Sequence, residues 1–102
     1  MTIGEKSTEL GVDLAQIALD ENVITTYTND GVFKCYCAGG EAQNIYIKDE
    51  NGVQLSQSYY IYETTEFTEA TELSVIQADF LAFINGQEFL PTPTADVVTV
   101  KE

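Results

Sequence analysis

The sequence predicts a single domain of the α+β class: a four-stranded antiparallel β-meander with one amphipathic helix packed on one face, a short N-terminal helix and a C-terminal edge strand. Three observations predict it. The 102 residues match the length of one domain, the centre alternates apolar and polar residues around two glycine turns, and a later segment repeats apolar residues at helical spacing. We expect an N-terminal segment over 1–22, two hairpins over 23–62, a helix over 69–85 and a tail over 86–102.

The N-terminal segment carries apolar residues at helical spacing. Leu14 and Ile17 lie three residues apart, and Asp13 precedes a glutamine by three residues, which is the spacing of a capping box. Glycine is unfavourable in the interior of a helix, so Gly11 restricts the expected helix to residues 14–21.

The two hairpins turn at Gly31 and Gly52. Loop length matters because a slip of one residue moves every side chain of a strand to the opposite face. A three-residue loop that ends in a left-handed glycine keeps the apolar residues of each hairpin together. It sets these residues opposite each other: Tyr27 and Phe33, Thr25 and Cys35, Ile47 and Leu55, Ile45 and Gln57. The expected strands are 23–28, 32–37, 44–48 and 53–62.

This register predicts a tyrosine row on the face of the sheet that the helix leaves uncovered. The apolar face then holds Val23, Tyr27, Phe33, Cys35 and Cys37. Contiguous exposed aromatic side chains mark docking surfaces. The candidate protein-binding residues are therefore Tyr36, Tyr46, Tyr60, Tyr62, Lys34 and Lys48. The alternative is that the N-terminal helix covers these tyrosines, or that they only stabilise cross-strand pairs.

The later segment has the features of a helix followed by a tail. Its apolar residues recur three and four apart, at Leu73, Ile76, Phe80, Phe83 and Ile84. Glu69 and Glu72 suit the positive end of a helix dipole, and Asn85-Gly86 is a stop signal. The tail carries two prolines and then a short strand at Val97–Val100, which we expect to pair at the edge of its own sheet or a neighbour's.

An acidic run, in which Glu-x-Thr/Ser is repeated four times, is a second candidate binding surface. Its carboxylates belong to Glu63, Glu66, Glu69 and Glu72. A helix would stack them about 5–6 Å apart, which resembles the spacing of DNA phosphates, whereas an extended chain would spread them to about 10 Å. Threonine disfavours helices, so we expect only the second half to be helical. The run is either a solvated connection into the helix or a surface that imitates DNA.

The charge of the chain excludes several classes of binding protein. Asp and Glu number 17 against 4 Lys, without Arg or His, and the formal net charge is -13 at pH 7. A surface that follows phosphates needs several Lys or Arg side chains, and the bidentate contact to guanine belongs to Arg. We therefore expect neither direct nucleic-acid binding nor docking on an anionic membrane.

Catalytic chemistry has few candidates in this sequence. Without His there is no imidazole base, and neither a glycine-rich phosphate loop nor a Gly-x-Ser-x-Gly elbow is present. Cys35 and Cys37 share one face of a predicted strand, where we expect two reduced thiols packed as small hydrophobes. The alternative, half of a metal site, lacks two further ligands. We predict no enzyme, no catalytic residue, no cofactor and no metal.

The ends of the chain bear on its location. No apolar run reaches the ~20 residues that cross a bilayer, and the first residues lack the basic end and apolar centre of a secretion signal. We therefore expect a chain that is not secreted through a signal peptide and that lies inside the host cell or in a virion.

Two non-enzymatic functions fit these observations. The preferred hypothesis is a small structural subunit of a larger particle, of the decoration or connector type in bacteriophage heads and tails. Its support is the tight hairpins, the tyrosine row and a tail that ends in a strand able to pair. The alternative is an acidic DNA mimic that inhibits a host DNA-binding or defence protein. Either function implies a protein partner: another copy of the chain, a capsid or tail protein, or the inhibited protein.

Overall fold

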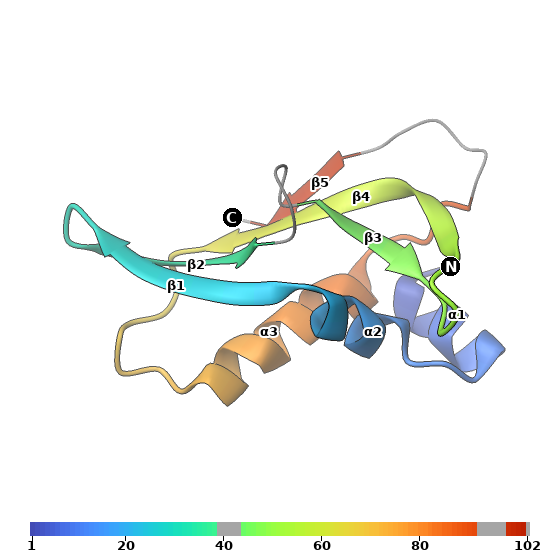
Figure 1. Ribbon diagram of the computed structural model, residues 1–102, viewed down its shortest axis with the longest axis horizontal. Coiled ribbons are helices and arrows are strands. Elements are labelled where there is room, and N and C mark those ends of the chain that lie inside the picture. The colour runs from blue at the N-terminus through green and yellow to red at the C-terminus, as the bar shows by residue number, and fades with distance from the viewer. Residues whose placement is uncertain (39–43, 92–97, 102) are drawn as a thin grey trace.

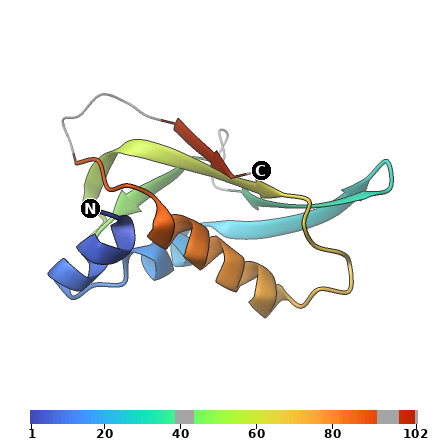
Figure 2. The ribbon, with the colours of Figure 1, turned by 180° about the vertical axis from the view of Figure 1, so that it is seen from behind.

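The computed structural model describes residues 1–38, 44–91 and 98–101. Its elements in chain order are α1 (Ile3–Leu10), α2 (Leu14–Glu21), β1 (Val23–Asn29), β2 (Val32–Ala38), β3 (Ile45–Lys48), β4 (Gln54–Thr64), α3 (Leu73–Gly86) and β5 (Val98–Lys101). The class is α+β, as predicted. Figure 1 shows the strands in one layer and the described helices in a second layer against one face of the sheet, and Figure 2 shows the same arrangement from behind.

The sheet has five strands in the described residues, in the order β1-β2-β4-β3, with β5 paired to β4. The predicted meander is wrong, because β2 pairs with β4 rather than with β3. Strand β4 has eleven residues and is long enough to pair with both strands. Its residues 54–60 pair with β3, and its residues 63–64 pair with β2. The C-terminal strand was predicted to begin at Val97, which lies outside the described residues; β5 runs parallel to β4.

The β1–β2 turn differs from the prediction by one residue. Asp30 and Gly31 both have positive φ, 52° and 76°, so the loop has two residues and the mirror-image twist that suits a hairpin. Tyr27 therefore lies opposite Lys34, not Phe33. The predicted three-residue loop is wrong because Asp tolerates the left-handed conformation almost as Asn does.

This change of register exchanges the two faces of β1. Ile24 and Thr26 now lie opposite Cys37 and Cys35, the two buried thiols of β2. Val23 and Tyr27, which were expected on the apolar face, point to the other side and are 66% and 41% exposed. Thr25 lies opposite Tyr36 instead of Cys35.

The β3–β4 turn has the predicted three-residue loop. Gly52 has a φ of 80°, and the Asp49 carboxylate accepts hydrogen bonds from the Asn51 and Val53 amides at 2.8 and 2.9 Å. Asp residues hold turns through such bonds to the backbone that follows them. Next to the loop, Lys48 lies opposite Gln54, which is the predicted register.

Further along these two strands the register shifts. Between Tyr46 and Lys48 an irregularity moves the pairing, so that Ile45 lies opposite Tyr60 instead of the predicted Gln57. The shift turns Tyr60 and Tyr62 to the helical side of the sheet, where they are 1% and 0% exposed. Their predicted place on the uncovered face is therefore wrong, because a β-bulge reverses which face the rest of the strand presents.

The N-terminal segment contains two helices where one was predicted. Thr2 and Glu5 form a capping box that starts α1: the Glu5 amide donates to the Thr2 hydroxyl at 3.1 Å, and the Thr2 amide donates to the Glu5 carboxylate at 2.8 Å. Gly11, with a φ of 69°, ends α1 in the left-handed conformation that glycine favours. The predicted helix over 14–21 is confirmed as α2.

Helix α3 begins four residues later than predicted. Leu73 is its first residue, and Glu72 is its N-cap without a side-chain capping bond. Glu69 lies in the preceding turn, so the first predicted turn of the helix is absent. Three of its apolar residues, Ile76, Phe80 and Ile84, are buried against the sheet as expected.

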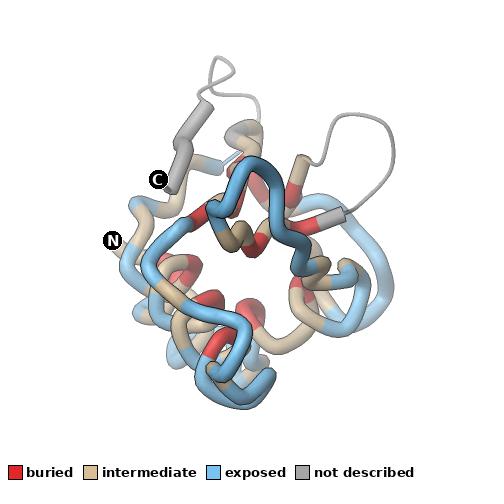
Figure 3. The backbone as a smooth tube through the Cα atoms, turned by 90° about the vertical axis from the view of Figure 1, so that its left-hand side faces the viewer, coloured by how far each residue is buried: buried red, intermediate tan, exposed pale blue. Residues whose placement is uncertain are grey.

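One core fills the space between the sheet and the helices. Figure 3 shows the buried residues gathered around the middle of the molecule, with exposed turns outside them. The Tyr62 ring lies 5.3 Å from that of Phe80, centroid to centroid, and its hydroxyl donates to the Asp79 carboxylate of α3 at 2.9 Å. Burial, together with this carboxylate, raises the pKa of the Tyr62 phenol.

The Tyr62 hydroxyl gives a test of this packing. Tyr62→Phe removes a hydrogen bond to a carboxylate, and we expect the free energy of unfolding to fall by about 1–2 kcal/mol. Tyr59→Phe, on the opposite side of the same strand, is the matched control and should change it by less than about 0.5 kcal/mol. Urea denaturation measures both variants. Equal losses in the two variants would contradict the assigned faces of β4.

Candidate protein-binding surface

The face of the sheet that points away from the helices carries two pairs of contacting tyrosines. Tyr27 and Tyr36 meet edge to face, with ring centroids 5.4 Å apart and an angle of 85° between the rings. Tyr46 and Tyr59 lie opposite each other across β3 and β4 with centroids 5.8 Å apart. We call this surface the outer face and define it by Tyr27, Lys34, Tyr36, Tyr46, Tyr59, Ile61 and Glu63.

The pairing of β2 with β4 joins the two tyrosine pairs into one row. Tyr36 lies opposite Glu63, and side chains two residues apart on a strand share a face. Glu63, Ile61 and Tyr59 therefore follow one another along β4 on the outer face. Tyr36, Tyr46, Tyr59 and Ile61 are all partly exposed. The row thus runs across four strands, from β1 to β3, without passing through the core.

The predicted lysines divide between the two sides of the molecule. The Lys34 ammonium lies 3.7 Å from the Glu63 carboxylate on the outer face. The Lys48 ammonium lies 3.7 Å from the carboxylate of Glu21, which belongs to α2 on the helical side. The Lys48 ammonium is therefore paired with a helix and not with a residue of the outer face. Both pairs are partly exposed, so each contributes at most about 1 kcal/mol.

Half of the predicted tyrosines lie on the outer face. Tyr36 and Tyr46 do, whereas Tyr60 and Tyr62 pack against α3. Sequence reasoning missed Tyr27 and Tyr59. For Tyr59 a signal was present, because successive residues of a strand point to opposite faces, and either Tyr59 or Tyr60 had to point outward. Without knowledge of the bulge, that choice could not be made.

The acidic run does not form a row on a helix. Glu63 lies in β4, Glu66 and Glu69 lie in the connection to α3, and Glu72 is the N-cap of that helix. The expectation that the second half of the run is helical is wrong, because the threonines between the glutamates favour an irregular connection over a helical turn. Stacked carboxylates at the spacing of DNA phosphates are therefore absent from this run.

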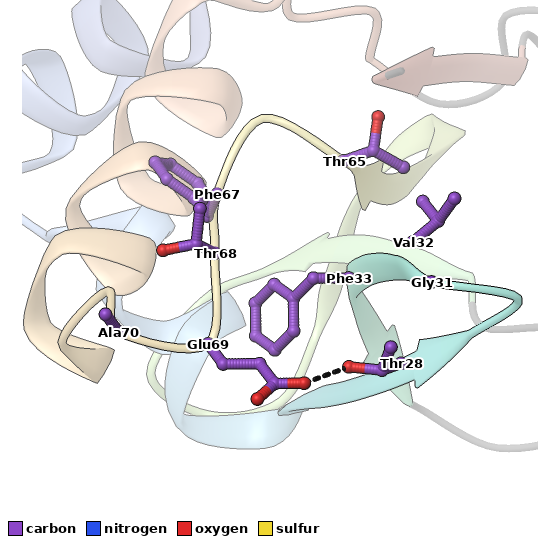
Figure 4. A pocket seen from close by; sticks show the side chains of 9 residues that line it. All are labelled: Thr28, Gly31, Val32, Phe33, Thr65, Phe67, Thr68, Glu69 and Ala70. Carbon is purple, nitrogen blue, oxygen red and sulfur yellow. Dashed lines mark hydrogen bonds between the residues drawn. The ribbon is translucent and has the colours of Figure 1, made fainter.

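The connection between β4 and α3 borders an open hollow beneath the β1–β2 hairpin tip (Figure 4). The hollow measures about 570 Å³ and is lined by Thr28, Gly31, Val32, Phe33, Thr65, Phe67, Thr68, Glu69 and Ala70. The Thr28 hydroxyl donates to the Glu69 carboxylate at 2.6 Å and so ties the connection to β1. Among the described residues of this lining, Glu69 is the one ionisable group, so they supply no acid-base pair.

The two thiols of β2 face the core. Cys35 and Cys37 are free and 0% exposed. Burial raises the pKa of Cys37 to about 11, and burial with the nearby Asp79 carboxylate raises the pKa of Cys35. Protonated, buried thiols are poor nucleophiles. The parts of the chain that the structure describes hold no group of three or more Cys, Asp or Glu side chains placed to bind a metal ion.

Comparison with known proteins adds no relative. No protein-family model matches the chain, and no match was found among the curated proteins or the solved structures. Over residues 1–38, 44–91 and 98–101, no helix is both long and apolar enough to cross a membrane.

The raised thiol pKa predicts a loss of stability in alkali. The unfolded chain gives up the Cys37 proton near the ordinary pKa of 9.0, whereas the folded chain holds it to about 11. Below pH 9.0 the Cys37 thiol therefore leaves the free energy of unfolding unchanged. As the pH rises from 9.0 to about 11, the free energy of unfolding falls by about 2 kcal/mol. Urea denaturation at a series of pH values measures the loss. Cys37→Ala should lose less over the same interval, and parallel curves for the two proteins would rule out the thiol as the cause.

Proposed function

We propose that the chain is a non-enzymatic assembly protein, a small structural subunit that binds a larger protein particle through its outer face. The observation that carries this proposal is the one-sided packing of the sheet. The described helices lie against the inner face, and the outer face presents four tyrosines and Ile61 in partial contact with solvent. Tyrosine rings offer a large contact area and lose little side-chain entropy on binding.

The partner that fits this face is a protein surface with an apolar centre and a rim of Lys or Arg side chains. The aromatic row supplies apolar contact area, and the net charge of -13 favours a basic partner over an acidic one. Lys34 is already paired with Glu63, so it offers little to an acidic partner. Opposite charges at the rim of an interface speed association and align the two surfaces.

We propose that the chain belongs to the class of decoration or connector subunits of phage heads and tails. Small size, tight glycine hairpins and a sheet with one face that no described helix covers suit a subunit that binds onto an existing surface. The tail supports this class less than expected, because β5 pairs with β4 of its own chain. The DNA-mimic alternative rests on the net charge alone, since the carboxylates of the acidic run are not stacked along a helix.

Replacing the partly exposed pair Tyr46 and Tyr59 tests the proposal. The double variant Tyr46→Ser, Tyr59→Ser removes apolar area from the outer face, and Leu73→Ser, Val75→Ser removes exposed apolar area from α3, where the two side chains are 54% and 50% exposed. A partner is first isolated from the source organism by its binding to the wild-type chain and is then titrated against all three proteins by biolayer interferometry.

We expect binding at least about tenfold weaker for the tyrosine variant and unchanged for the α3 variant, since each lost aromatic contact at an interface costs on the order of 1 kcal/mol or more. Circular dichroism establishes that both variants are folded. Loss of binding in the α3 variant alone would place the interface on the helical side. Loss of wild-type binding in high salt, with the tyrosine variant unaffected, would favour the acidic mimic over the outer face.

A further inference from the structure

Strand β1 forms an edge of the sheet along which no other described strand pairs, although the Glu69 carboxylate accepts a hydrogen bond from the side chain of Thr28. It pairs with β2 on one side, and no described backbone group forms a hydrogen bond to its other side. Its seven residues, VITTYTN, include no charged residue and no proline. Natural edge strands are usually protected by Lys, Pro, a bulge or shortness. A regular, uncharged edge of this length is a template for pairing with another strand.

The two-residue turn determines which backbone groups point away from β2. A tight turn of this kind closes on a hydrogen-bonded pair, here Asn29 and Val32. Hydrogen-bonded and non-hydrogen-bonded pairs alternate along an antiparallel ladder. The amides and carbonyls of Thr25 and Tyr27 therefore point toward β2, and those of Ile24, Thr26 and Thr28 point to the open edge.

We propose that the open edge of β1 pairs with β1 of a second copy of this chain, antiparallel and centred on Thr26. The strand is self-complementary in this register. Thr26 lies opposite Thr26 of the second copy, Ile24 opposite Thr28, Thr25 opposite Tyr27, and Val23 opposite Asn29. No pair sets like charges against each other, and threonine pairs and aromatic–β-branched pairs are favourable across strands. The interface is isologous, as in most two-fold dimers.

Two copies repel each other least at this edge, because β1 carries no charged side chain. Each copy carries -13, so most approaches of two copies place carboxylates against carboxylates. The seven residues of β1 carry no charge. At each end of the paired strands, Asp30 of one copy lies opposite Asn22 of the other, so the repulsion that weakens the dimer at low ionic strength comes from the net charge of the two copies. Added salt screens this repulsion and strengthens the dimer.

The size of the contact sets the expected affinity. One strand edge of seven residues buries less than the roughly 1,000 Å² of a tight interface, so the dimer forms at high protein concentration and dissociates on dilution. Pairing joins the two sheets at β1 and brings the two outer faces side by side, with Tyr27 next to the seam. The inference does not rest on the function of the outer face, since it follows from the edge alone.

A pair of substitutions at one position tests the edge. Thr26→Pro removes an amide that points away from β2, so the β1–β2 ladder is kept, as edge strands tolerate proline there. Thr26→Val removes the same hydroxyl and keeps the amide. Sedimentation velocity over a range of protein and salt concentrations measures the association. As the concentration rises, wild type and Thr26→Val should pass from a monomer of 11.2 kDa to a dimer of twice that mass. Thr26→Pro should associate at least about tenfold more weakly. A wild-type chain that stays monomeric at high salt and concentration, or equal association of the two variants, overturns the proposal.

Cross-linking tests the register without relying on the proline variant. Opposed residues of an antiparallel pair have Cα atoms about 4.5–5.5 Å apart, which a disulfide can span. Thr26→Cys should therefore form a disulfide-linked dimer on mild oxidation. Val53→Cys, at a site that is 56% exposed on another turn, is the control and should form it much more slowly. Equal rates, or a Thr26→Cys chain that captures other proteins and not itself, contradict pairing between copies.

Discussion

The pairing of Ile45 with Tyr60 across β3 and β4 determines which side chains each face of the sheet presents. From that pair onward, every second residue of β4 points toward the helices, so Tyr60, Tyr62 and Thr64 enter the core. The residues that alternate with them, Tyr59, Ile61 and Glu63, lie on the outer face. One strand of eleven residues thus contributes tyrosines both to the core and to the outer face.

The buried tyrosines explain how an acidic chain with two small cysteines in its sheet fills its core. Tyr60 and Tyr62 supply the volume that Cys35 and Cys37 do not, and they pack against Phe80 and Phe83 of α3. Each hydroxyl has an acceptor, the carbonyl of Glu88 for Tyr60 and the Asp79 carboxylate for Tyr62. Buried phenols need such partners. The polar tips therefore hold α3 and its following segment in place against the sheet.

Local patterns predicted most elements because each signal lies within a few residues. Gly52, the α2 helix and the strand positions follow from turn chemistry and periodicity. Helix α1 does not follow from the prediction, although Thr2 and Glu5 have the spacing of a capping box, because a glycine that disfavours a helix interior can equally end a helix, as Gly11 does. The face of β1 was predicted wrongly because a two-residue and a three-residue loop both place an apolar residue of β1 on the inner face. The three-residue loop places Val23 there, and the two-residue loop places Ile24 there.

The outer face could be predicted only in part because its composition depends on contacts between distant segments. The β3–β4 bulge and the pairing of Cys35 with Thr64 are set by tertiary packing, which no local pattern encodes.

Chemical nitration of tyrosine, located by tandem mass spectrometry, tests this arrangement most directly because Tyr59 and Tyr60 are adjacent in the sequence. We predict that the folded chain is nitrated at Tyr46 and Tyr59 while Tyr60 and Tyr62 are protected until the chain is unfolded. Nitration of Tyr60 as fast as that of Tyr59 would contradict the register on which the outer face depends.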